Sequence, residues 1–230
     1  MARARNSIIG EITGSIGDVT IRQRKGRTII SARPKRFMPG DDENSIRRRA
    51  TFGVATRLAK EIHSIPELST IWTRNLPEGK KSGYNFIITS NLKQVGPNSM
   101  TDQAAITPAG GFNVGISGIE FVSDAITAVV GPIGSDSGID PSSDLFAKLV
   151  VVAGIFSTVP EGRPEFAAMS SGKQELALDA ALRFSLPFGG IDPKKSGPGN
   201  EIHLMLAVVL LDKDEKPTKF SKTVHIRLVV

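Results

Sequence analysis

The glycines at the start of the chain are the first residues whose spacing suggests chemistry. Gly10, Gly14 and Gly17 could form a loop whose backbone N–H groups bind phosphate. Such a loop also needs a Lys-Ser or Lys-Thr pair before a helix, and Gly17 is followed by a predicted hairpin instead. The segments 79–82 (GKKS) and 189–196 (GGIDPKKS) contain only part of the motif. We expect these glycines to form turns, and we predict no cofactor.

The three histidines are candidates for metal binding or proton transfer. His63, His203 and His225 are too far apart in sequence for a local H-x-x-x-H pair. His203 and His225 fall in the last two predicted strands and could be cross-strand neighbours. A metal site there would need a third ligand, which the sequence does not identify, so we predict no metal site.

Residue patterns for nucleophilic or acid–base catalysis are missing from the sequence. It contains no cysteine and no G-x-S-x-G motif. Its carboxylate clusters, Asp41-Asp42-Glu43 and 212–215, fall at a predicted helix start and in a predicted turn, where local structure accounts for them. We therefore predict a protein that is not an enzyme, with no catalytic residue and no small-molecule substrate.

Positive charge is concentrated in the first 36 residues. They hold nine basic and two acidic residues, a net of +7, whereas the rest of the chain has a net charge of −1. Such a segment can bind phosphates of nucleic acid. No aromatic residue precedes Phe37, so stacking on bases is not expected. The residues predicted to contact a partner or a polyanion are Arg22, Arg24, Lys25, Arg27, Arg33, Lys35 and Arg36.

A β-hairpin is predicted to position these basic residues. Two β-prone runs within residues 16–33 flank a turn at Lys25-Gly26, which would set Arg24 opposite Arg27. One face is then cationic and the other apolar. Because an isolated hairpin is marginally stable in water, its apolar face needs cover from its own domain or from a neighbour. That face carries Val19, Ile21 and Ile30, with Thr28 and Ala32.

Residues 41–98 change to helical spacing. Apolar residues recur every four positions from Ile46 to Ile62, through Ala50, Val54 and Leu58, and Phe52 widens the stripe. A second helix is predicted from Pro66. A third is predicted from an N-cap at Ser82, and Gly96-Pro97 is predicted to end it.

From about residue 105 the pattern alternates with a period of two and predicts strands. Without helical crossovers between them, such strands favour an antiparallel sandwich. The predicted class is α+β, with a basic Gly-rich β-hairpin arm (1–40), a helical segment (41–98) and an antiparallel β-sandwich (105–230). The predicted strands are 112–122, 124–130, 145–156, 163–169, 174–186, 201–211 and 218–229.

Three segments resemble a family of uncharacterised bacterial proteins that is best represented in Bacteroidetes. They are residues 10–36 (GEITGSIGDVTIRQRKGRTIISARPKR), 47–62 (RRRATFGVATRLAKEI) and 82–93 (SGYNFIITSNLK). The resemblance covers residues 8–95 by motif and includes an Arg-x-x-Phe element, Arg49 and Phe52. It implies a basic N-terminal hairpin, a helical middle and a β-rich C-terminal half. It implies no activity.

These observations favour a structural or assembly protein, such as a component of a virion or another repeating particle. The basic hairpin would make contacts with further copies or with another structural subunit. The alternative is a protein associated with nucleic acid that binds phosphates through residues 1–36. We expect no membrane partner, because the sequence shows neither a signal peptide nor a spanning segment. The expected location is the cytoplasm or the assembled particle.

Overall fold

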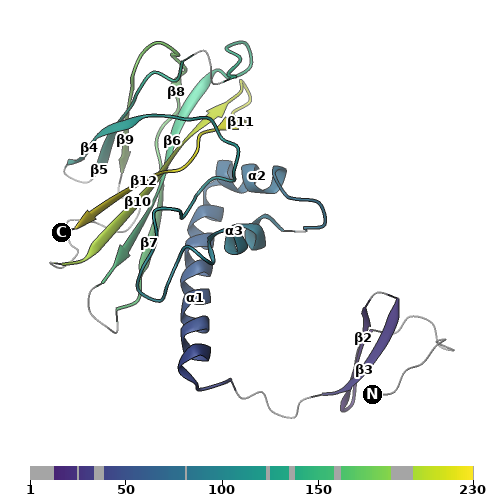
Figure 1. Ribbon diagram of the computed structural model, residues 1–230. Coiled ribbons are helices and arrows are strands. Elements are labelled where there is room, and N and C mark those ends of the chain that lie inside the picture. Colours follow the sequence, from purple (N-terminus) through teal and green to yellow (C-terminus); the bar gives the residue numbers. More distant parts are fainter. Residues whose placement is uncertain are drawn as a thin grey trace. The chain divides into compact units, whose positions relative to one another are not determined.

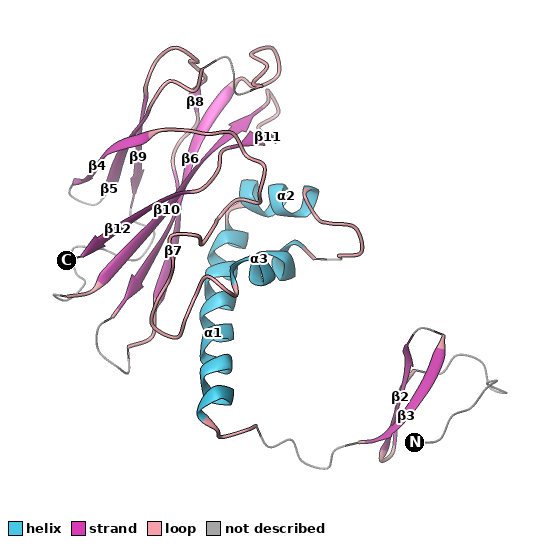
Figure 2. Ribbon diagram, viewed as in Figure 1, coloured by secondary structure: helices cyan, strands magenta, loops and turns pink. Residues whose placement is uncertain are grey.

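A computed structural model describes residues 13–24, 26–33, 39–80, 82–122, 125–134, 138–157, 162–187 and 199–229. Three of the predicted contact residues, Lys25, Lys35 and Arg36, lie outside these ranges. The chain divides into two compact units, Met1–Ile46 and Arg47–Val230. The α+β class, with an N-terminal hairpin, helices in the middle and a strand-rich C-terminal half, is confirmed (Figure 2).

The first unit contains a small antiparallel sheet. Its strands are β1 (Gly14–Ile16), β2 (Val19–Arg24) and β3 (Arg27–Ala32), and they lie in that order. The predicted hairpin of β2 and β3 is confirmed, including the pair Arg24 and Arg27. The strand β1 was not predicted. It pairs with β2 through a turn at Gly17, whose φ of 54° suits glycine.

The second unit is built around two long central strands. These are β6 (Phe146–Phe156) and β10 (Glu201–Leu211), which pair antiparallel over their whole length (Figure 1). Shorter strands complete this six-stranded sheet at both edges. The edge of β6 carries β7 (Glu165–Ser170) and β8 (Gln174–Glu175), and the edge of β10 carries β11 (Pro217–Phe220) and β12 (Val224–Val229).

A second, three-stranded sheet covers one face of the first. Its order is β4 (Ile116–Val122), β5 (Ala125–Val130) and β9 (Leu182–Pro187), all antiparallel. Side chains of β5 and β9 pack against those of β6 and β10 in one apolar cluster. This is the predicted antiparallel sandwich. Its buried members include Ile126, Phe184, Leu149, Leu206 and Leu210.

Helices cover the opposite face of the central sheet (Figure 1). They are α1 (Glu43–Ser64), α2 (Pro66–Arg74) and α3 (Gly83–Asn91). Ser82 is the predicted N-cap of α3, and its hydroxyl accepts a hydrogen bond from the backbone N–H of Asn85 at 3.3 Å. The indole of Trp72 is buried and donates to the backbone carbonyl of Ile106 at 2.8 Å.

This layered arrangement explains the unbroken apolar run in β10. A strand that is buried on both faces needs apolar residues at every position. Leu204 and Leu206 face the second sheet, while Met205 and Ala207 face the helices. All four are fully buried.

The predicted apolar stripe of α1 is wrong in its N-terminal half. Ile46 is 51% exposed and Phe52 is 52% exposed, and Ala50 is exposed as well. The buried stripe begins at Val54, because only the C-terminal part of the helix packs on the sheet and on α2 and α3.

Two of the predicted strands are interrupted. The predicted strand 174–186 is β8 and β9, since the chain there leaves the central sheet and joins the second one. The predicted strand 218–229 is broken at Ser221, where one extra residue lies opposite β10. The buried Ser221 hydroxyl accepts from the backbone N–H of Val208 at 2.9 Å and so repairs the ladder. The predicted strand 112–122 begins later, at Ile116, and the third helix ends earlier than Gly96, at Asn91.

Candidate functional site

The N-terminal sheet has two chemically different faces, which follow from its register. Val19 lies opposite Ala32, and Ile21 lies opposite Ile30. Ile16 pairs with Val19 and so joins the same face. Gln23 and Thr28 close this face near the turn with a side-chain hydrogen bond of 2.7 Å. The register therefore places Val19, Ile21 and Ile30 on one face, and β1 adds Ile16 to it.

This apolar face has little cover within the sheet. Ile16 is 64% exposed and Ile30 is 40% exposed, while Val19 and Ile21 are half-buried. Among residues 13–24 and 26–33, no residue is buried. A three-stranded sheet needs a packed hydrophobic face for stability, and this one has none of its own.

The opposite face carries arginines, hydroxyl groups and the half-buried Ile29, which lies opposite Arg22. Arg22 and Arg24 are two positions apart on β2, and Arg24 lies directly opposite Arg27 on β3. All three are exposed. The hydroxyls of Ser15 and Thr20 lie 3.4 Å apart on this same side.

These arginines lack an acidic partner within the described part of the chain. No ion pair joins Arg22, Arg24 or Arg27 to a carboxylate there. Asp18, which lies at the far end of β2, is about 20 Å from Arg24 along the strand. At physiological salt this distance exceeds the screening length of about 8 Å, so Asp18 does not offset the positive charge of Arg24 and Arg27.

Arg33 lies at the other end of the sheet from Arg24 and Arg27. Its backbone N–H donates to the carbonyl of Asp18 at 2.6 Å, which continues the β2–β3 pairing by one residue as predicted. The structure thus brings Arg22, Arg24 and Arg27 together and places Arg33 apart from them, beside an acidic residue. A phosphate-binding surface on this sheet would be centred on Arg22, Arg24 and Arg27.

The strand β1 could have been recognised from a short signal. Ile16 and Val19 flank the pair Gly17-Asp18, and a glycine followed by aspartate is a common two-residue hairpin turn. The flanking segment is only Gly-Ser-Ile, whose first two residues have low strand propensity. The pairing with β2, rather than local propensity, makes it a strand.

A second polar cluster lies at one end of β10 and β12. The Nδ1 atom of buried His203 is 3.2 Å from Nε2 of His225, and its Nε2 atom is 3.3 Å from a carboxylate oxygen of Glu201. Glu201 also forms an ion pair of 2.5 Å with Arg227. The His203 ring makes a T-shaped contact with the ring of Phe156. The cross-strand proximity of the two histidines, considered from sequence, is therefore real.

Burial lowers the pKa of both histidines, because a charged imidazole loses hydration there. The neighbouring His203 lowers the pKa of His225 further, and Glu201 only partly offsets the effect of burial on His203. Burial also opposes ionisation of Glu201, but its bonds to Arg227 and His203 outweigh this and lower its pKa.

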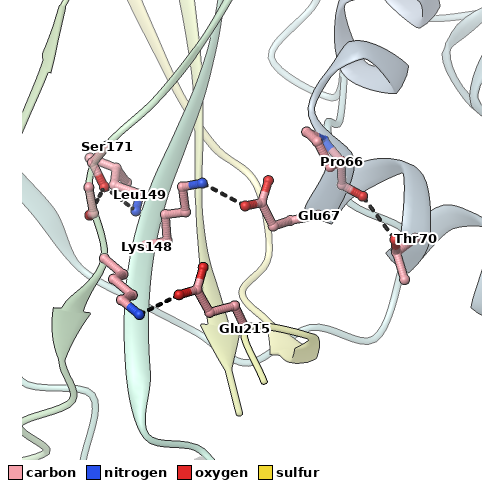
Figure 3. Close-up of polar contacts among 9 residues, drawn as sticks. Pro66, Glu67, Thr70, Lys148, Leu149, Ser171 and Glu215 are labelled. Carbon is pink, nitrogen blue, oxygen red and sulfur yellow. Dashed lines mark hydrogen bonds and ion pairs between the residues drawn. The ribbon is translucent and has the colours of Figure 1, made fainter. Parts of the chain in front are cut away.

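Further ion pairs attach peripheral elements to the sandwich (Figure 3). Lys148 of β6 contacts Glu67 of α2 at 2.6 Å, with both side chains largely buried. Lys173 contacts Glu215 in the β10–β11 turn at 2.5 Å and lies over the ring of Phe146. These contacts connect strands, a turn and a helix, so packing accounts for them without a ligand.

Asp144 and Lys219 form another such contact. The buried Asp144 carboxylate is 3.3 Å from the ammonium of Lys219 and accepts the backbone N–H of Asp140 at 2.9 Å. The bonds hold the 138–144 loop against β11. Across the described ranges, no three His, Cys, Asp or Glu side chains are grouped to bind a metal ion. In those ranges no helix has both the length and the apolar character to cross a bilayer.

Comparison with protein-family models, with curated proteins and with solved structures found no match in any of the three. The resemblance of residues 8–95 to a bacterial family therefore stays a prediction.

Proposed function

We propose that this chain is a non-enzymatic structural protein that assembles with further copies of itself, as a component of a virion or another repeating particle. The N-terminal sheet is the element that makes the contact between copies. The proposal depends on one observation: the described part of residues 13–33 contains no buried residue, although one face of the sheet is apolar.

Covering this face would supply the stability that the sheet lacks. Ordering a residue's backbone costs about 1–2 kcal/mol, and a sheet without a core gains little to offset that cost. Burying an exposed isoleucine contributes about 1.5–3 kcal/mol. A partner that covers Ile16 and Ile30 would therefore stabilise both the sheet and the assembly.

A second copy fits this face better than other partners because the face is self-complementary. Two N-terminal sheets related by a two-fold axis would pack apolar face to apolar face, about 10 Å apart, as in a sandwich. Their arginine faces would then point away from each other. Pairing through the arginine faces would instead oppose like charges.

A repeating particle also needs a second contact on each copy. Within the described part of the chain, β4 and β9 are the edges of the three-stranded sheet, and edge strands can pair with another chain. Val122, at the end of β4, is 48% exposed. This edge is the place where we expect assembly to continue beyond a dimer.

The test is the mass in solution of the full-length chain, measured by light scattering. We expect a dimer or a larger multiple of 24.6 kDa. The double variant Ile16→Ser/Ile30→Ser should no longer associate through this face and should give a smaller species. The control for nonspecific hydrophobic association is Phe52→Ser/Val122→Ser, which removes two similarly exposed apolar side chains from the second unit. This control variant should still form at least the dimer.

A wild-type chain that stays monomeric up to high concentration would contradict the proposal. So would equal dissociation of the dimer by the two double variants, because the association would then not be specific to the N-terminal sheet.

A further inference from the structure

We infer that the arginine face of the N-terminal sheet binds the phosphate backbone of nucleic acid without sequence preference. This goes beyond self-association and uses the opposite face of the same sheet. The inference depends on the side chains that the register gathers near the β2–β3 turn: Arg22, Arg24 and Arg27.

The arrangement of these arginines is costly unless an anion is present. Like charges placed directly opposite on neighbouring strands repel each other, and Arg24 and Arg27 are such a pair. Arg22 adds a third charge about 7 Å along β2. Because no carboxylate in the described ranges pairs with them, an external anion is the group that can relieve the repulsion.

The chemistry of the face fits phosphate in particular. A guanidinium group presents a planar fork of N–H donors that can bind two phosphate oxygens at once. The hydroxyls of Ser15, Thr20 and Ser31 lie on the same face. Ser31 donates to the Thr20 carbonyl at 3.5 Å and the Ser15 and Thr20 hydroxyls share one bond, so one of these last two is left to donate to a phosphate oxygen. A strand also repeats its side chains along a line, as successive phosphates do along a nucleic-acid strand.

The same face lacks the groups that read bases. It carries no aromatic side chain, so bases have no stacking platform, and no aromatic residue precedes Phe37 in the chain. Contacts confined to phosphate give affinity that depends on salt but not on sequence.

An acidic surface on a second copy is the weaker alternative. Residues 37–230 have 20 basic and 21 acidic residues, so the body of the chain offers no marked excess of negative charge. A duplex carries one charge per about 1.7 Å of its axis, a far denser array.

Binding of the full-length chain to a labelled random duplex of about 30 base pairs, at several salt concentrations between about 50 and 200 mM, tests this inference. The triple variant Arg22→Gln/Arg24→Gln/Arg27→Gln should bind more weakly. Its log–log salt slope should be flatter than that of the wild type by about 2.7, or about 0.9 for each phosphate that the variant no longer neutralises.

The control variant makes the same change in net charge elsewhere. Arg47→Gln/Arg163→Gln/Arg183→Gln removes three exposed arginines of the second unit and should keep nearly the wild-type slope. Equally weakened binding in both triple variants would overturn the inference, since net charge alone would then explain binding. Competition by polyglutamate as strong, per charge, as that by duplex DNA would also overturn it.

The two proposals about this sheet fail separately. If the Ile16→Ser/Ile30→Ser chain is monomeric and binds DNA with the wild-type slope per chain, the faces act independently as inferred. If the wild-type chain is monomeric but binds through Arg22, Arg24 and Arg27, self-association is wrong and phosphate binding stands. If the wild-type chain is a multimer that does not bind duplex DNA, phosphate binding is wrong and self-association stands.

Discussion

While both imidazoles are neutral, the hydrogen bonds around His203 have only one consistent direction. Ionised Glu201 can only accept, so Nε2 of His203 carries the hydrogen and Nδ1 is left as an acceptor. His225 must then donate its Nε2–H to that atom. This contact allows at most one charged imidazole. His225 can carry a second hydrogen on Nδ1 without disturbing the bond, whereas a protonated His203 could donate only if His225 carried its hydrogen on Nδ1 instead of Nε2. Two charged imidazoles would place two N–H groups against each other.

A dependence of stability on pH follows. Both histidines have a folded pKa below the ordinary 6.5, so the unfolded chain binds more protons as the pH falls below that value. The free energy of unfolding should therefore fall on acidification from about pH 7.5 to about 5.5, measured by urea denaturation. At still lower pH, protonation of Glu201 should add to the loss, since its folded pKa is also lowered.

The variant His225→Gln should lose roughly half of this acid-induced destabilisation, because one of the two titrating imidazoles is gone. Its amide N–H can still donate to His203, which preserves the packing. His63→Gln, in an exposed position on α1, is the matched control. An identical acid response in wild type and His225→Gln would rule out the histidine pair as its source.

Pairs of residues were predictable wherever a local turn determines the register. The predicted turn at Lys25-Gly26 gave the pair Arg24 and Arg27 correctly. The predicted strands of His203 and His225 made their proximity a possibility, but these residues lie on either side of the break at Ser221, so their register could not be predicted from the sequence. The bond between Glu201 and Arg227 was not predicted, because it requires the register across the break at Ser221. A one-residue bulge leaves no clear signal in the alternation of apolar residues.

Among the connecting segments, residues 107–112 carry the chain from the helices to the second sheet and are held tightly at the β11–β12 junction. The backbone N–H of Phe112 donates to the carbonyl of Phe220 at 3.1 Å, and Lys222 donates back to Phe112 at 2.8 Å. The Thr107 hydroxyl donates to the Ser221 carbonyl at 3.0 Å. Gly111 lies so close to this junction that only a residue without a Cβ fits.

The variant Gly111→Ala should therefore be destabilised by about 1–3 kcal/mol, the usual cost of overpacking a rigid site. An added Cβ would lie 2.6 Å from the backbone carbon of Ser221, and a backbone atom cannot rotate away. Gly172→Ala, whose Cβ would meet nothing within 4 Å, should change stability by less than about 0.5 kcal/mol. Urea denaturation measures both, and equal stabilities would contradict the close packing described for this junction.

Helices and strands were predicted well where burial agrees with the sequence period, and poorly where it does not. The predicted bounds of β10 are correct because its apolar run ends at polar residues on both sides. The N-terminal half of α1 has the apolar spacing of a buried helix, yet Ile46 and Phe52 are exposed. Periodicity shows which side chains share a face, but only the fold shows whether another element covers it.

For the chain as a whole, the described N-terminal sheet presents Arg22, Arg24 and Arg27 of the basic segment on one face and three isoleucines and one valine on the other. In our proposal a second copy covers the apolar face and a polyanion binds the arginine face, so a dimer of such sheets would present arginines on both outer surfaces. The alternation of residue types predicts on which face of the sheet each side chain lies. It does not predict which molecule binds each face, because that depends on groups outside the sheet.

Site-specific crosslinking can determine whether a second copy covers the apolar face. The chain has no cysteine, so Ile30→Cys and Ser31→Cys each introduce a single thiol, on the apolar and the arginine face respectively. A bismaleimide with a reach of about 10 Å, the usual distance between packed sheets, can join two thiols across the interface. We expect a crosslinked dimer for Ile30→Cys and little crosslinking for Ser31→Cys. Equal crosslinking of both, or none of Ile30→Cys, would contradict the proposed contact.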